Sequence, residues 1–243
     1  MTVTCSIYPI PLYTVAAQKS RILYLSESDE KTTVCCYIWL IKGSDRTVLI
    51  DGGGSAEFTE TRYPGVRNLQ SLEAGLATVE MSPDDIDTVI LTHLHHDHAE
   101  YIERFRKAEL IVQREELAFA LDPHPFYSEL YHSATLKRVH FRTITGDREI
   151  AKGIRVIFTP GHSVGGQSVA IETVAGTAVI TGFCCTWDNF MPPEKIKERI
   201  PVIPFALHTD AIKTYNSMLK VKKIADLLIP LHDSRFSQQK VLP

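Results

Sequence analysis

The sequence contains no apolar run approaching the roughly 20 residues that a membrane-spanning helix needs. Its longest apolar run, residues 34–41, fits a single buried strand. The first residues lack the cationic stretch that opens a secretory signal peptide. The formal net charge of −3 lacks the basic excess typical of a nucleic-acid-binding protein. These absences predict a cytoplasmic protein whose partner is neither a membrane nor a nucleic acid.

The chain has few cysteines, and their spacing suits neither a disulfide nor a zinc knuckle. The chain has 5 cysteines, and four of them form the adjacent pairs Cys35-Cys36 and Cys184-Cys185. Neighbouring residues of a strand point to opposite faces of a sheet, so neither pair suits a disulfide. The absence of a Cys-x-x-Cys spacing argues against a zinc knuckle.

The sequence also lacks internal repeats, low-complexity tracts and linkers, which predicts one domain covering residues 1–243. Hydrophobic residues make up 44% and charged residues 23%, as in a globular protein with a sizeable core. Strand patterns dominate, with helical patterns interspersed, and this order favours two packed sheets with helices outside. The expected strands are residues 7–15, 22–25, 33–41, 47–50, 88–91, 110–113, 139–144, 154–158, 168–172, 177–181 and 227–230, and the expected longer helices are 68–79, 114–121 and 209–225.

What the chain has in unusual density is histidine. Four of its 10 histidines fall between His93 and His98, in the stretch Thr-His-Leu-His-His-Asp-His that follows the strand expected at 88–91. Protonated imidazoles repel one another and resist burial, so such a cluster is either exposed in a loop or gathered around a cation. His93 and His95 are two residues apart, and in an extended chain both project to the same side.

Three more polar stretches follow expected strands in the same way. They are Asp51-Gly52-Gly53-Gly54, the Pro160-Gly161-His162-Ser163 turn, and His232-Asp233. Loops at strand ends often carry the chemistry of a protein. The sequence therefore predicts that these residues gather with the histidine cluster.

The ordered motifs resemble those of a known family. The string from His93 to His98 matches His-x-His-x-Asp-His, Asp51 opens an Asp-x-Gly, and His162 and His232 follow in order. This pattern resembles the metallo-β-lactamase superfamily, and most of all its N-acyl homoserine lactonase branch. The resemblance implies an α/β fold, an αβ/βα four-layer sandwich with metal ions at one edge between the sheets.

Site roles follow from the same resemblance. His93, His95 and His162 would bind one metal ion, and Asp97, His98 and His232 a second. Asp51 would accept a hydrogen bond from a ligand histidine and fix its tautomer. Zinc is the expected metal, as one or two ions, and iron or manganese also fit the donors.

The implied activity is that of a metal-dependent hydrolase. Metal-bound hydroxide would attack the carbonyl of a lactone, ester or amide, and Asp97 would be the catalytic residue that orients the nucleophile and receives its proton. The implied partner is a small-molecule substrate, and the resemblance also suggests a homodimer.

The sequence departs from the family near residue 183. Phe183 occupies the position of an aspartate that bridges two metal ions, and Thr186 that of a tyrosine near the substrate carbonyl. Cys184 or Cys185 could supply a thiolate as an extra ligand; the competing interpretation is that both are buried thiols. Phe183 and Trp187, together with residues 122–131, would form an apolar wall of the substrate pocket.

Two alternative functions follow from these departures. Asp97, His98 and His232 are a two-histidine, one-carboxylate set, which suits a mononuclear iron oxygenase. A protein that keeps its metal but has lost turnover would instead act as a sensor.

Overall fold

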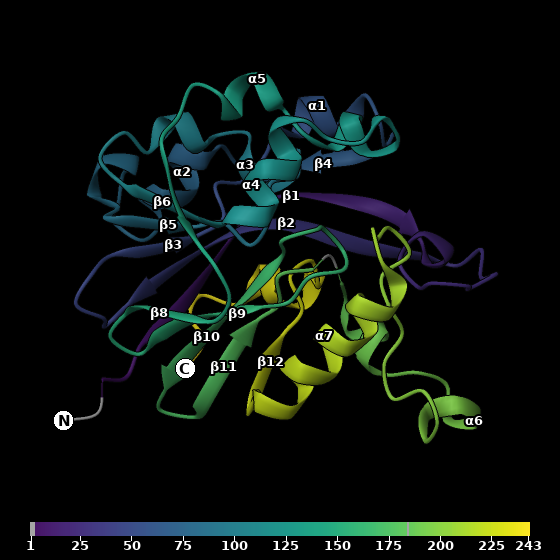
Figure 1. Ribbon diagram of the computed structural model, residues 1–243. Helices are drawn as coiled ribbons and strands as arrows, with labels where there is room; N and C mark the ends of the chain where they lie inside the picture. Colours follow the sequence, from purple (N-terminus) through teal and green to yellow (C-terminus); the bar gives the residue numbers. More distant parts are fainter. Residues whose placement is uncertain (1–2, 184) are drawn as a thin grey trace.

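The computed structural model describes residues 3–183 and 185–243, which form two packed β-sheets (Figure 1). The larger sheet has the strand order β4 (Val66–Asn68), β1 (Ser6–Gln18), β2 (Lys31–Lys42), β3 (Val48–Ile50), β5 (Thr88–Ile90), β6 (Glu109–Gln113) and β7 (Phe141–Ile144). The smaller sheet has the order β12 (Leu227–Ile229), β11 (Gly176–Ile180), β10 (Gln167–Thr173), β9 (Ile154–Phe158) and β8 (Arg148–Ala151).

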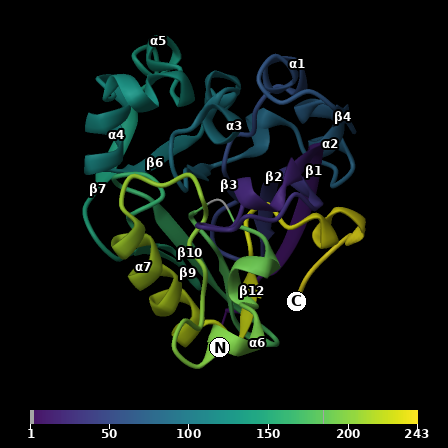
Figure 2. The ribbon, with the colours of Figure 1, turned by 90° about the vertical axis from the view of Figure 1, so that its right-hand side faces the viewer.

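Helices cover the outer faces of both sheets (Figures 1 and 2). The larger sheet carries α1 (Ala56–Glu60), α2 (Leu72–Ala77), α3 (His96–Ala99), α4 (Arg114–Leu121) and α5 (Ser133–Leu136). The smaller sheet carries α7 (Ala211–Ile224), and α6 (Glu194–Lys197) projects from the same side. The layers are therefore helix, sheet, sheet and helix, which confirms the αβ/βα sandwich expected from the sequence.

Apolar side chains fill the three spaces between these layers. One buried cluster lies between the helices and the larger sheet, a second between the two sheets, and a third between the smaller sheet and α7. Strand β2 contributes to the first two, because its alternate residues face opposite sides. Cys35 belongs to the cluster between the sheets and Cys36 to the cluster under the helices, as their adjacency predicted.

The strand directions bring the polar loops to one edge. Strands β3, β5 and β6 are parallel, so the loop with Asp51 after β3 lies beside the loop with His93 after β5. In the smaller sheet, His162 follows β9 and His232 follows β12. The ends of these four strands supply the candidate site, and the rest of the fold holds them in place.

Several short elements differ from the sequence prediction. The strand predicted at 22–25 is wrong: Ile22 caps a 3₁₀ turn, Lys19–Arg21, and Leu23 makes one isolated bridge to Phe205. Helix α2 is shorter than the predicted 68–79, and α1 and α3 were not expected, because a helix of about one turn shows no apolar periodicity. In the described part of the chain, no helix has the length and apolarity to cross a membrane.

Candidate metal centre

Two sets of three side chains converge at the edge between the sheets. In the first set, the loop after β5 supplies two histidines and the loop after β9 supplies a third: His93, His95 and His162. In the second set, α3 supplies a carboxylate and a histidine, and the segment after β12 supplies another histidine: Asp97, His98 and His232. Within each set the ligand atoms lie within 4.8 Å of one another. The structure thus brings together all six residues that the resemblance implied as metal ligands.

Hydrogen bonds at the Nδ1 atoms orient three of these rings. Each Nδ1 meets an oxygen that can only accept: His98 with Asp51 Oδ2 at 2.8 Å, His232 with the Cys35 carbonyl at 2.9 Å, and His162 with the Leu207 carbonyl at 2.6 Å. Each Nδ1 therefore donates a proton. In the neutral ring the other nitrogen, Nε2, then carries a lone pair, which is the form that binds a metal ion.

His93 is oriented through a relay that ends on Asp51. The Thr92 hydroxyl donates to Asp51 Oδ2 at 2.9 Å, so its oxygen accepts from His93 Nδ1 at 3.0 Å. Asp51 also accepts from the Thr92 amide at 2.7 Å. One fully buried carboxylate therefore fixes the rings of His93 and His98, one from each ligand set.

The Nε2 atoms face one another at short range. His93 and His162 Nε2 are 3.3 Å apart, and His98 and His232 Nε2 are 3.2 Å apart. Lone pairs at such distances repel unless a proton or a cation lies between them. The donor chemistry and the tautomers therefore fit divalent ions: three neutral imidazoles suit zinc with an open position, and the second set adds an anionic oxygen.

The second set also attracts protons. Burial of the His98 ring opposes protonation, but the carboxylates of Asp97 and Asp51 outweigh it and raise the pKa of His98 well above its ordinary value. The Asp97 carboxylate is 3.2 Å from His98 Nε2 and 3.7 Å from His232 Nε2. The raised pKa favours the protonated ring, and a metal ion that binds Nε2 competes with that proton.

Glu116, which the sequence did not single out, ties the two histidine loops together. It lies in the first turn of α4 and is fully buried. Oε1 accepts from the Leu94 amide, and Oε2 from the Gly165 amide, both at 2.9 Å. Leu94 separates His93 from His95, and Gly165 follows His162 in the other loop. One carboxylate therefore sets the distance between the two loops that supply the first ligand set.

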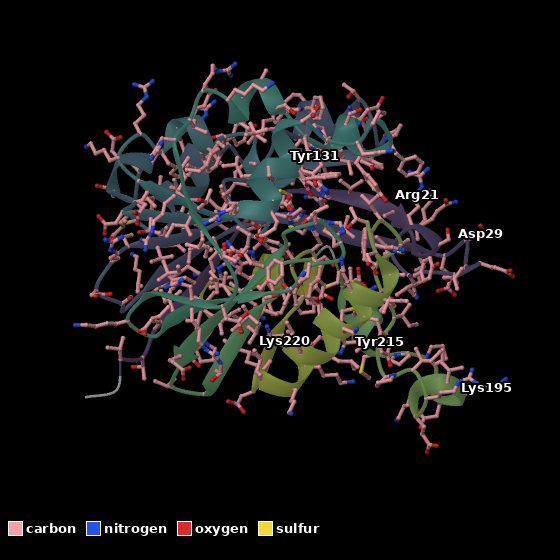
Figure 3. All side chains as sticks on the ribbon, in the orientation of Figure 1. Arg21, Asp29, Tyr131, Lys195, Tyr215 and Lys220 are labelled. Carbon is pink, nitrogen blue, oxygen red and sulfur yellow. The ribbon has the colours of Figure 1, made fainter. Side chains whose placement is uncertain are left out.

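A pocket of about 590 Å³ opens beside the ligands. At the site it is lined by His95, Asp97 and His232. Most of the remaining lining is apolar or small and comes from β1, from the segment after it and from two distant loops: Val15, Ala16, Ala17, Ile22, Leu130, Phe205 and Ala206. Figure 3 shows Arg21, another lining residue, at the outer end of the β1–β2 hairpin.

His96, the histidine between the two ligand pairs, belongs to neither set. Its ring packs against Phe58 with the centroids 4.8 Å apart, and it lines the pocket. Burial lowers the pKa of His96 to about 4, although Asp97 acts in the opposite direction. His96 is thus a neutral side chain of the pocket wall.

The structure corrects the apolar wall expected from Phe183 and Trp187. Phe183 lies beyond the end of β11 and belongs to the cluster under α7, where its ring lies 6.3 Å from that of Phe190. Trp187 stacks under the Arg235 guanidinium at 5.0 Å. Neither residue lines the pocket described above. Of the segment 122–131, Leu130 does line it.

Cys185 is a buried thiol, as the competing interpretation held, and Thr186 does not line the pocket. Cys185 is fully buried in the cluster under α7, with its sulfur 3.1 Å from Thr181 Oγ1, and it is in neither ligand set. Cys184 lies outside the described residues. Thr186 is buried, and its amide donates to Asn189 Oδ1 at 2.9 Å, at the start of a 3₁₀ turn away from the pocket.

These features define a class: a metalloprotein with an αβ/βα sandwich and two adjacent ligand sets at one sheet edge. The chain belongs to the metallo-β-lactamase superfamily, whose family model matches residues 34–182. The match includes Asp51, the whole histidine cluster and His162.

Similar proteins of this family include N-acyl homoserine lactonases. One from Bacillus thuringiensis is 33% identical over 150 residues, which are 61% of this chain and 57% of the relative. N-acyl homoserine lactonase AiiB from Agrobacterium fabrum is 32% identical over 65% of this chain and 66% of its own length. The alignments thus span less than two thirds of these relatives.

Solved structures extend the similarity over nearly the whole chain. The crystal structure of a B. thuringiensis AiiA mutant with N-decanoyl-L-homoserine bound at its active site covers 97% of this chain and 95% of its own. The TM-score is 0.77 at 27% identity. The sandwich and the lactonase resemblance expected from the sequence are confirmed.

Asp51→Asn tests the orientation of the rings. Asp51 has a φ of 62°, a left-handed conformation that asparagine also adopts readily, so the variant should fold normally. An amide NH₂ facing His98 cannot accept the Nδ1 proton, and we expect metal affinity to fall by about 10–100-fold. Chelator competition measures this affinity, and Asp29→Asn, on the exposed hairpin seen in Figure 3, is the matched control. Equal affinity in the two variants would refute the orienting role of Asp51.

Proposed function

We propose that this protein is a metal-dependent hydrolase that opens lactones, with N-acyl homoserine lactones as the favoured substrate class. The observation that carries the proposal is the position of two ligand sets at one end of a largely apolar pocket. The lactonase relatives and the neighbour with bound N-decanoyl-L-homoserine support it. They favour hydrolysis over the iron oxygenase and the sensor.

The proposed ligands are His93, His95 and His162 for one ion and Asp97, His98 and His232 for another, with zinc as the proposed metal. A bound divalent ion supplies a nucleophilic water at neutral pH and polarises the substrate carbonyl. Two divalent ions held by these adjacent sets would repel each other, and Asp97 would supply an anionic oxygen that offsets part of this repulsion.

The chain's own residues then position the reactants. Asp97, partly exposed at the pocket, orients the water and takes up its proton. The water oxygen bonds to the carbonyl carbon, and the ring C–O bond breaks with its electron pair left on the departing oxygen. The proton on Asp97 passes to that oxygen, which gives a hydroxy acid. The apolar lining from β1 and Leu130 holds the acyl chain and excludes water.

The test uses full-length protein loaded with zinc and a series of lactones with acyl chains of increasing length. We expect ring opening to the hydroxy acid, followed by NMR, to stop when a chelator removes the metal and to return when zinc is restored. An oxygen electrode runs in parallel. Iron-dependent oxygen consumption without hydrolysis would replace this proposal with the oxygenase, and ligand-induced stabilisation without product would favour the sensor.

Domain organisation, assembly and location complete the proposal. We propose a single domain, because both sheets contribute to the cluster between them. Homodimer formation and a cytoplasmic location stay predictions from the sequence, and so does an extra thiolate ligand from Cys184.

A further inference from the structure

A β-bulge in β1 determines where Tyr13 points. The antiparallel register of β1 with β2 pairs Pro11 with Tyr37 and then Tyr13 with Cys36, so Leu12 is an extra residue. Ile10, before the bulge, and Leu12, within it, both belong to the cluster under the helices. Regular alternation would send Tyr13 to the opposite face, towards the second sheet. The bulge instead turns Tyr13 to the helix side as well, where it lines the pocket.

Contacts on both sides hold the bulge in place. The Leu12 carbonyl accepts from the amides of Leu69 at 2.9 Å and Gln70 at 3.2 Å. The Leu12 side chain fills the space beside Gly53, where it would collide with the Cβ of any other residue. The orientation of Tyr13 is therefore fixed by its neighbours in the larger sheet and its loops.

The Tyr13 hydroxyl donates its proton only to a weak hydrogen-bond acceptor. Thr59 Oγ1 donates to the Tyr13 oxygen at 2.9 Å, which leaves the tyrosine's own O–H for another acceptor. That O–H interacts with the thiol of Cys36, and a cysteine sulfur is a weak acceptor. A stronger acceptor, such as a substrate carbonyl oxygen, can replace it.

Tyr13 also shares its pocket with the candidate metal ligands. Cys36 is the cross-strand partner of Tyr13, and the Cys36 sulfur lies 3.2 Å from the backbone carbonyl oxygen of Asp97. Tyr13 lines the same pocket as His95, Asp97 and His232. Burial is the main reason that the pKa of Tyr13 lies well above its ordinary value, so the phenol stays protonated at neutral pH.

We propose that Tyr13 is a catalytic residue whose hydroxyl donates a hydrogen bond to the carbonyl oxygen of the bound lactone as negative charge develops there. The proposal rests on the proposed hydrolase function. No proton leaves Tyr13: the hydrogen bond moves from the Cys36 sulfur to the substrate oxygen. Removing one such donor from an active site lowers kcat by about 10²–10³-fold.

The experiment compares zinc-loaded wild type with Tyr13→Phe, which keeps the buried ring and removes only the hydroxyl. We expect kcat for lactone opening to fall by roughly 100-fold, with KM changed by less than about threefold, because the donor acts mainly in the transition state. Zinc content and melting temperature should stay near the wild-type values. Thr59→Val removes the neighbouring hydroxyl but leaves the Tyr13 donor, so its kcat should fall by less than about tenfold.

The other outcomes would contradict either the catalytic role of Tyr13 or the proposed hydrolase function. Equal kcat in Tyr13→Phe and wild type would overturn the catalytic role and leave the hydrolase function standing. A loss of kcat that follows a loss of zinc or of melting temperature, or that Thr59→Val matches, would assign Tyr13 a structural role instead. A wild type inactive on every lactone would overturn the proposed function, and this role with it.

Discussion

His95→Ala is expected to lose most of its bound metal and to hydrolyse lactones at the background rate. The substitution removes one of three imidazoles from the first ligand set, and the two that remain come from different loops. Zinc sites that perform hydrolysis keep three protein ligands, so a two-histidine remnant should bind zinc far more weakly.

The measurement is zinc per chain, by elemental analysis, on protein purified under the same metal supply as wild type. His140→Ala is the matched control, because His140 is exposed and lies outside both ligand sets. Since the His95 ring also packs against Tyr131, at 5.0 Å between centroids, a melting curve shows whether the variant is folded. Wild-type zinc content in folded His95→Ala would refute the ligand assignment.

Phe183→Asp is expected to have the largest effect on stability. From the family pattern, an aspartate at this position would bridge two metal ions and raise metal occupancy. The structure instead places Phe183, which is 1% exposed, in the apolar cluster with Phe190 and Met218. A carboxylate buried there without a partner should lower the free energy of unfolding by about 3–5 kcal/mol.

For a chain of this size, that loss corresponds to a melting temperature lower by roughly 6–20 °C. Phe183→Leu keeps the site apolar and should lower the free energy of unfolding by less than about 2 kcal/mol. Thermal unfolding of both variants, with zinc content measured in parallel, separates the two interpretations. An aspartate variant as stable as wild type and richer in zinc would show that residue 183 faces the metals.

The ligand sets could be predicted because their residues lie in short motifs directly after strands. His93 and His95 need only local geometry to face one point, and parallel strands bring Asp51 to the same edge. Phe183 shows the limit of this reasoning. A motif position identifies a residue type, whereas the direction of the side chain depends on the path of the chain after β11 ends at Ile180, which takes Phe183 into the cluster under α7.

The residues that support the site could not be predicted in this way. Glu116 has the sequence pattern of an exposed acidic residue in the first turn of a helix, and only the packing of α4 against two distant loops buries it. Tyr13 lies in an ordinary strand pattern, and the register slip that turns it towards the pocket depends on contacts with Leu69, Gln70 and Gly53. Such tertiary contacts leave no local signal in the sequence.

The buried carboxylate of Glu116 has a consequence for how the first ion is captured. Because it holds the loop of His162 against the loop of His93 and His95, the third imidazole is presented to the other two at a high effective concentration. Folding already orders these two distant segments and bears the loss of conformational entropy. Binding of the ion therefore costs little further entropy. Affinity for the first ion is therefore set in part by a residue that never touches it.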